Sequence, residues 1–216
     1  MKRKKNKRNN QIKISSGGKA RGVSRITNFI GASGIVPPVN QTKTISFTAL
    51  GQSYFMQFDQ NGSPTEVALL AKSQTSIGPF SPVFLSGGNI DTSQSSQIQS
   101  YIFRLKSGTI TSISGQFTTN QDIDISELDT AFISCGIWSA PVGSNIFSQL
   151  AIIDLQPGLT EFVNSGTTVQ ATTQTSVPVD ISRQYLFVYS ARFEGVPQIV
   201  GAGFSGTGSG SIVITH

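Results

Sequence analysis

Hydrophobic and polar residues alternate in short stretches along most of the chain from residue 42 onward. Stretches rich in Thr, Val, Ile, Phe and Tyr are separated by clusters of Gly, Asn, Asp, Pro and Ser, a spacing typical of β-strands joined by turns. Residues 44–50 and 99–105 alternate with a period of two, and Tyr101, Phe103 and Leu105 fall on one face of the second stretch. Each stretch predicts a strand with one buried side.

Two other stretches are more uniformly apolar. Residues 130–139 are hydrophobic and long enough for a central strand, and residues 185–191 are nearly continuous in apolar and aromatic side chains, as expected of a fully covered strand. Further strands are expected at 109–118, 146–155, 167–175 and 208–215, with turns at 107–108, 156–158 and 164–166 and a tight bend within 201–210. About ten strands without an amphipathic helix predict an all-β, two-sheet jelly-roll sandwich.

The basic residues gather at the N-terminus. Residues 1–25 hold ten of the 16 Lys and Arg and no Asp or Glu, so they carry +10, whereas residues 26–216 carry six basic and 11 acidic residues, a net charge of −5. The basic residues of this segment are Lys2, Arg3, Lys4, Lys5, Lys7, Arg8, Lys13, Lys19, Arg21 and Arg25.

We therefore divide the chain into a disordered basic arm (1–25), a Gly- and Pro-containing connector (26–40) and the jelly-roll domain (41–216). Like charges at this density repel one another and leave little apolar surface to bury, which predicts disorder. Such an arm binds polyanions by releasing counterions, and the partner is nucleic acid, an acidic glycan or the acidic face of another copy. A solubility or assembly arm without a defined ligand is the alternative.

Several classes of protein are disfavoured. The chain has no run of 18 apolar residues, so no membrane span is predicted, and the charged N-terminus is not followed by the apolar core of a secretory signal, which predicts synthesis in a cytoplasm. Cys135 is the only cysteine, which excludes an intramolecular disulfide. Its apolar neighbours predict an inert buried thiol, with a cross-link between subunits as the alternative.

Catalytic chemistry has few candidates. One His and one Cys cannot supply a general base with its partners, and they are too few ligands for a zinc site. His216 is the last residue of the sequence and is expected to be mobile. The sequence therefore predicts no enzyme activity, no cofactor and no small-molecule substrate. Calcium ligands are a weaker possibility at Asp122, Asp124, Glu127 and Asp129, although alternation of Asp with Ile equally describes a strand edge with solvated charges.

Aromatic and glycine-rich features have structural interpretations. Trp138 and the many Phe residues suit a stacking platform for sugars or bases, but Phe103, Phe117, Phe187 and similar residues lie within apolar strands, which favours packing in a core or at a threefold interface. The glycines of 201–210 lack the Gly-Lys-Ser/Thr of a phosphate-binding loop.

Four stretches resemble, in their amino-acid sequence and in their order along the chain, the C-terminal domain of the BclB-type exosporium glycoproteins of bacterial spores. They are residues 107–117, 138–147, 183–191 and 199–206, and the resemblance covers a little over half of the chain. It implies a jelly roll like that of tumour necrosis factor or complement C1q, assembled as a homotrimer at the spore surface. The family's collagen-like stalk is absent, and the basic arm occupies its place.

The sequence therefore predicts a non-enzymatic structural protein of a spore surface layer, a homotrimer or a larger lattice, whose arm anchors it to an acidic partner. The alternative is a capsid-like shell protein whose arm binds packaged nucleic acid, because a disordered basic arm on a jelly roll is also the layout of small capsid subunits. In that case only phosphate neutralisation is expected, without base readout. A carbohydrate-binding lectin is a third possibility that the fold permits.

Overall fold

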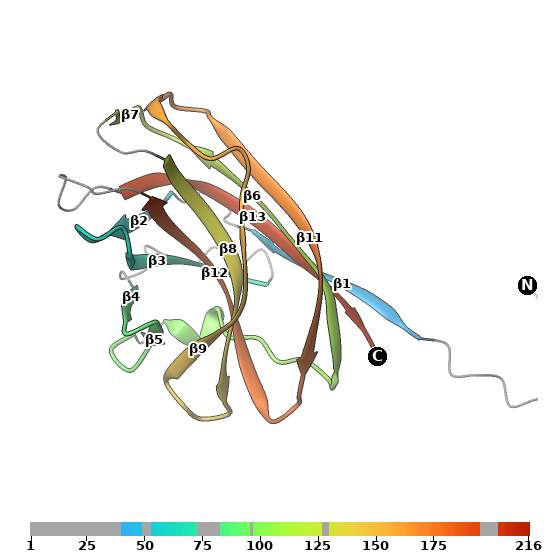
Figure 1. Cartoon of the computed structure of the whole chain (residues 1–216). Helices are drawn as coiled ribbons and strands as arrows, with labels where there is room; N and C mark the ends of the chain where they lie inside the picture. Colours follow the sequence, from blue (N-terminus) through green and yellow to red (C-terminus); the bar gives the residue numbers. More distant parts are fainter. Residues whose placement is uncertain (1–39, 49–52, 73–82, 96, 127–129, 195–202) are drawn as a thin grey trace, which may run out of the picture. The chain divides into compact units, whose positions relative to one another are not determined.

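The computed structural model describes residues 40–48, 53–72, 83–95, 97–126, 130–194 and 203–216. These residues form thirteen strands and one short 3-10 helix, η1 (Ile98–Ser100), which confirms the predicted all-β class (Figure 1). The strands are β1 (Thr42–Thr48), β2 (Tyr54–Phe58), β3 (Pro64–Leu70), β4 (Val83–Ser86), β5 (Asn89–Asp91), β6 (Gly108–Thr119), β7 (Ile123–Ile125), β8 (Thr130–Pro141), β9 (Ile146–Asp154), β10 (Glu161–Val163), β11 (Thr168–Val179), β12 (Arg183–Glu194) and β13 (Gly203–Thr215). No helix among the described residues is long and apolar enough to cross a membrane.

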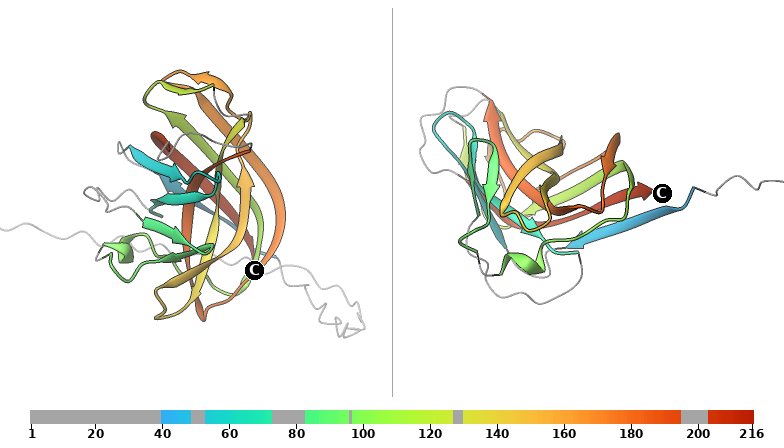
Figure 2. Two further views of the ribbon diagram at one scale, coloured as in Figure 1. Left: turned by 60° about the vertical axis from the view of Figure 1, so that its left-hand side comes forward. Right: turned by 90° about the horizontal axis from the view of Figure 1, so that it is seen from below.

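Six strands close on themselves. The order is β3–β12–β8–β9–β5–β4, and β4 returns to pair with β3, so these strands form a small barrel (Figure 2). Apolar side chains fill its interior, because every second residue of β8 and β12 points inward. Among the large ones, Trp138 and Phe147 pack with Leu69, Leu186 and Val188.

The other long strands form a second layer. Its order is β11–β6–β13, with β1 and β2 both paired to the free side of β13. The inner face of this layer packs on the outer side of β8 and β12, and side chains from both contribute to the larger core. Phe47 of β1 stacks on Phe187 of β12 with ring centroids 4.5 Å apart, and Phe117 of β6 contacts Tyr189 at 5.9 Å.

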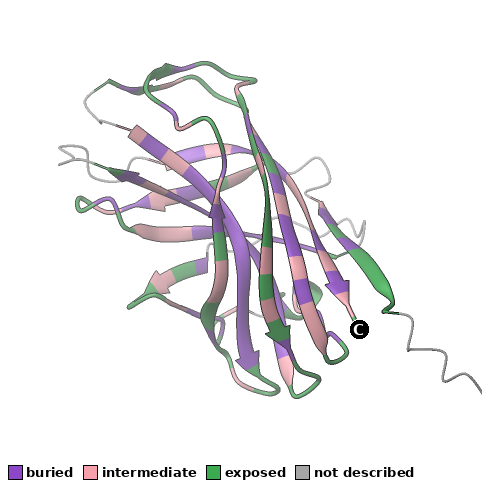
Figure 3. Cartoon of the chain, turned by 45° about the vertical axis from the view of Figure 1, so that its right-hand side comes forward, coloured by how far each residue is buried: buried purple, intermediate pink, exposed green. Residues whose placement is uncertain are grey.

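Strand β12 is covered on both sides, as its nearly continuous apolar sequence predicts. Leu186 and Val188 point into the barrel, whereas Tyr185, Phe187 and Tyr189 point into the core between the layers, and all five are fully buried. Figure 3 shows the contrast between the long buried stretches of the central strands and the mostly exposed β11 at the edge. The prediction that the strand aromatics serve packing is confirmed for these residues.

The expected bend within 201–210 is wrong for the described part of that stretch. Residues 203–210 continue as strand β13, because their glycines allow the layer to approach the aromatic rings of β12. A Cβ atom at Gly210 would lie 2.3 Å from Phe187 Cζ, and one at Gly115 of β6 would lie 2.3 Å from Cys135 Sγ. Both distances are shorter than any van der Waals contact, so only glycine fits there.

The predicted strand at 99–105 is also wrong. Its first residues lie in η1, and afterwards only Phe103 makes a strand-like bridge, to Tyr185. The burial pattern nevertheless follows the alternation, because Tyr101, Phe103 and Leu105 are all buried. The expected hairpin turn at 107–108 is absent as well, since β6 pairs with the sequence-distant strands β11 and β13.

Cys135 lies in the core between the two layers. Burial raises the pKa of its thiol to about 12, despite a hydrogen bond with Tyr189. The neighbouring Tyr189 hydroxyl accepts a hydrogen bond from the Gln116 backbone N–H at 3.0 Å and lies 2.7 Å from the Ser209 carbonyl oxygen, to which it donates. The predicted burial of Cys135 is confirmed, and its thiol is inaccessible in the folded protein.

We predict that Gly210→Ala destabilises the fold by about 1–3 kcal/mol, because the added methyl group forces Phe187 or the whole layer to move. The measurement is the midpoint and slope of urea unfolding. Thr207→Ala is the matched control, since Thr207 is exposed on the same strand, and it is expected to change stability by less than about 0.5 kcal/mol. Equal midpoints for the two variants would contradict the close approach of the layers.

Candidate anion-binding groove

A groove of about 700 Å³ lies at the end of the molecule where β1 begins and β13 ends. Its lining includes the buried apolar residues Ile45, Leu105 and Ile214 and a set of exposed cationic side chains. These are Lys43, Lys72, Arg104 and Lys106. None of the described residues that line the groove is an Asp or a Glu.

Segments far apart in the sequence supply these side chains. Lys43 comes from β1, Lys72 follows β3, and the other two come from the segment between η1 and β6. The terminal residue joins them, because the His216 N–H donates to the Gln41 carbonyl oxygen at 3.0 Å and His216 Nδ1 lies 2.8 Å from the Ser107 carbonyl oxygen. His216 is thus hydrogen-bonded to two segments at the rim of the groove, and its mobility stays a prediction.

The groove concentrates positive charge on an otherwise acidic body. It holds four of the six Lys and Arg outside the predicted arm, and none of the four forms an ion pair with a described carboxylate. Unbalanced like charges repel one another and raise the free energy of the folded state, so a bound anion stabilises this arrangement. The groove therefore has the chemistry of an anion site.

The opposite end of the molecule is acidic. Strand β6 runs from the groove to this end over 12 residues, on the order of 40 Å. Beyond it, β7 and β10 pair as a small ribbon that carries the exposed residues Asp122, Asp124, Glu161 and Phe162. The body thus has a basic end and an acidic end.

The predicted calcium ligands lie partly in this ribbon. Asp122 accepts a hydrogen bond from the Ser165 N–H at 2.7 Å, and Asp124 accepts one from the Ser126 N–H at 3.0 Å. The hydrogen bonds from Ser126 lower the pKa of the Asp124 carboxyl. Glu127 and Asp129 lie outside the described residues, and no group of three or more potential ligands occurs within the described part of the chain. Calcium binding here stays a prediction.

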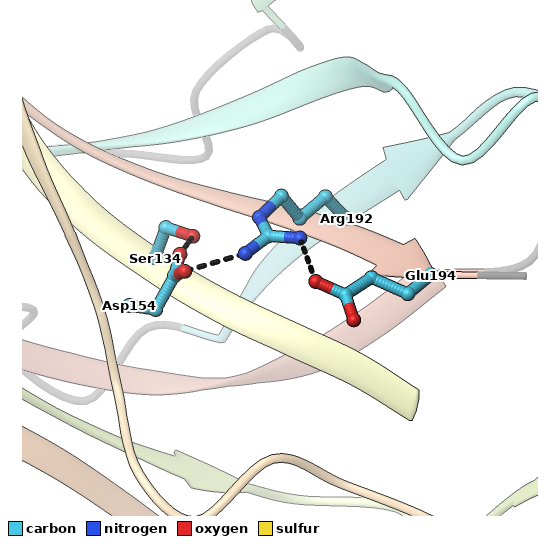
Figure 4. A network of polar contacts seen from close by, with 4 residues as sticks. All are labelled: Ser134, Asp154, Arg192 and Glu194. Atoms are coloured by element: carbon cyan, nitrogen blue, oxygen red, sulfur yellow. Dashed lines mark hydrogen bonds and ion pairs between the residues drawn. The ribbon is translucent and has the colours of Figure 1, made fainter. Parts of the chain in front are cut away.

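A charged network links three strands toward the same acidic end (Figure 4). The Arg192 guanidinium of β12 donates to Asp154 of β9 at 2.5 Å and to Glu194 at 3.2 Å, and the Ser134 hydroxyl of β8 donates to Asp154 at 2.6 Å. The guanidinium also lies 4.6 Å from the centre of the Phe132 ring. Arg192 thus balances Asp154 and Glu194, and among the described residues no ion pair is formed by the ribbon carboxylates.

The remaining candidates from the sequence are placed as follows. All ten basic residues of the arm lie outside the described residues, as does the connector except Asn40. Trp138 is buried in the barrel and presents no surface for stacking, so its packing role is confirmed. The sequence analysis did not identify the groove. The available signal was the scarcity of Lys and Arg after residue 25, since four of the six such residues line the groove.

Comparison with known proteins adds little. No family model and no curated protein matches the chain. Among solved structures, a cleaved adhesin domain of Lys-gingipain from Porphyromonas gingivalis aligns with 82% of this chain and 98% of that domain, at 11% identity and a TM-score of 0.30. A likeness this distant carries no argument, so we infer function from the residues of the chain itself.

The Asp154 network predicts a loss of stability in acid. Burial alone would raise the pKa of the Asp154 carboxyl, but Arg192 and Ser134 outweigh it and hold the pKa below its ordinary value. The carboxylate therefore stabilises the fold above the ordinary carboxyl pKa of about 3.9, and this contribution is lost as the pH falls through that value toward the lower pKa of the folded state.

The test is urea unfolding of the wild type and of Asp154→Asn between pH 7 and pH 3. We expect the variant to be less stable at pH 7 and the difference to narrow below about pH 4. Glu194→Gln is the control, since it removes the more exposed partner of the same guanidinium. A difference that is constant across this pH range would contradict the assignment.

Proposed function

We propose that this chain is a non-enzymatic structural protein that assembles into a surface layer through a jelly-roll domain and is anchored by its basic arm. The resemblance of four stretches to the BclB-type exosporium domain favours a spore surface as the place of that layer. The observation that carries the proposal is the segregation of charge: a basic arm of +10 and a basic groove stand against an acidic remainder.

The order of the strands supports the jelly-roll assignment. One layer reads β1–β13–β6–β11 and the facing strands read β3–β12–β8–β9. Apart from β8 and β9, which are consecutive and paired, neighbouring strands in these two sets are distant in the sequence, as in two interlocked Greek keys. Strands β5 and β4 extend the β3–β12–β8–β9 set beyond β9, and β4 pairs with β3 to close the barrel.

The outer face of the second layer, formed by β1, β13, β6 and β11, supports a symmetric trimer. It carries a shallow groove of about 630 Å³, whose described lining residues are Ser, Thr, Gln, Gly and Ala together with Phe47, none of them charged. Around a symmetry axis, each residue near the axis meets its own copies. An uncharged face therefore packs against itself without repulsion, whereas either charged end of the molecule would not.

The capsid-like alternative has its own supporting observation. The four cations of the groove lie at the end where β1 begins, and the arm precedes β1 in the sequence. A polyanion held by both would be neutralised along its backbone without base readout. Nucleic acid is one such polyanion, so the first test must separate the two functions.

That test is the native mass of the full chain, purified without nuclease, measured by light scattering with absorbance at 260 and 280 nm. We expect a trimer or a multiple of trimers free of nucleic acid. A much larger particle with dominant 260 nm absorbance that falls apart at high salt would support the packaging alternative instead.

Deleting residues 2–25 is expected to leave the trimer intact and to weaken binding to acidic polymers strongly, because the arm supplies ten of the 16 cations. Binding to heparin and to DNA of equal length, measured against salt concentration, provides the readout. Loss of the trimer in the deletion variant would overturn this division of roles.

A second variant tests the trimer face. Ser211→Lys introduces a positive charge on the uncharged outer face of β13, so three like charges would meet near the axis, and we expect monomers at micromolar concentration. Gln149→Lys on β9 is the matched control, since Gln149 is exposed on the other group of strands. Trimers in both variants would contradict the assignment of this face.

A further inference from the structure

The two ends of the body are complementary in both charge and shape. The basic groove combines an apolar floor with cationic walls. The acidic ribbon at the other end combines an exposed aromatic side chain with carboxylates. Because β6 joins the two ends, one copy presents them on opposite sides and cannot bring them together itself.

The outer face of the ribbon is defined by its register. Phe162 lies directly opposite Asp124 in the β7–β10 ladder, so the two side chains stand on the same face. Both are exposed, and Phe162 retains 54% of its accessible surface. The residues that alternate with them, Ile125 and Val163, are buried in the core. The ribbon therefore holds an aromatic ring and a carboxylate outward while its inner face is fixed.

Phe162 and Asp124 complement the groove in hydrophobicity and in charge. Burying Phe162 over the apolar floor removes exposed aromatic surface from water. The same approach brings Asp124 and its neighbour Asp122 toward four cations that lack carboxylate partners among the described residues. The ribbon supplies an aromatic ring and carboxylates, and the groove supplies apolar residues and cations.

We propose that the groove of Lys43, Lys72, Arg104 and Lys106 receives the β7–β10 ribbon of a second copy, so that copies join head to tail. This inference rests on the proposed function, since it names a contact for the assembly that function requires. The contact is heterologous, and it is separate from the uncharged outer face of the second layer, which is assigned to the trimer. It therefore links copies or trimers into larger arrays.

The contact is electrostatic at its rim, so it weakens with salt. Charges of opposite sign at the surface attract over about 10 Å at 0.1 M salt and over much less at 1 M. We expect the full chain to form species larger than the trimer at low salt and to return to the trimer at high salt.

The experiment exchanges the charges in full-length protein and follows mass by sedimentation velocity. The groove variant is Lys43→Glu with Arg104→Glu, and the ribbon variant is Asp122→Lys with Asp124→Lys. Each alone is expected to weaken formation of the larger species at least tenfold. An equimolar mixture is expected to restore it in part, because the altered groove of one variant then faces the altered ribbon of the other.

Two further variants sharpen the assignment. Phe162→Ser removes the aromatic contact without changing charge and is expected to weaken the larger species several-fold at any salt concentration. Glu194→Lys is the matched control: it reverses a charge at the same end but outside the ribbon, on a side chain that is 62% exposed. It is expected to leave the larger species nearly unchanged.

The outcomes separate this inference from the function beneath it. Larger species that persist in the groove and ribbon variants would overturn the head-to-tail contact and leave the structural function standing, with the arm as the linker. Loss of heparin or DNA binding in the groove variant, with mass unchanged, would overturn it in favour of a free polyanion. A full chain that is monomeric at every salt concentration would overturn both.

Discussion

The close approach of two layers across Gly115 and Gly210 is the constraint on which the rest of the structure depends. Since no side chain intervenes, the rings of Phe187 and Tyr189 pack directly on the backbone of the facing layer. The Tyr189 hydroxyl then reaches backbone groups of both β6 and β13, and burial raises its pKa. A buried hydroxyl costs stability unless it is hydrogen-bonded, so this residue fixes the lateral position of the layers as well as their separation.

Fixing the layers also fixes where charge can be placed. Both sides of β12 and most of β8 are buried, and ionised groups are excluded from such positions unless they are paired. The outer face of the second layer carries mainly Ser, Thr and Gln. The remaining sites are mostly the loops and strand ends, and the four cations and the ribbon carboxylates lie there. Burial of the middle therefore confines charge to the periphery, whereas the sign of the charge at each end is set by the sequence.

The sequence identifies elements whose signal is local and misses those whose signal is not. The apolar run at 185–191 predicts β12 because its burial is encoded residue by residue. The alternation at 99–105 gives the buried side correctly but not the hydrogen-bond partners, since a chain crossing the end of the core shows the same pattern as a strand. Glycines at 203–210 suggest a bend, although the facing rings that require them are named only by the fold. The groove is invisible because its cations are up to 63 positions apart; they are Lys43, Lys72, Arg104 and Lys106.

The two contacts proposed for the assembly, at the uncharged outer face of the second layer and at the charged ends, differ in their physics. Hydrogen bonds and packing at this uncharged outer face respond weakly to ionic strength, because the contact brings no charged groups close to one another. The ends attract through unit charges at the surface, and the arm adds ten more to the basic side of the balance. In the proposed assembly, the arm and the groove would compete for the same carboxylates at low salt. The groove has buried apolar residues beneath its cations, so the exposed Phe162 ring would gain more from the groove than from an arm in which ten of 25 residues are Lys or Arg. The apolar floor rather than charge would then favour the groove over the arm.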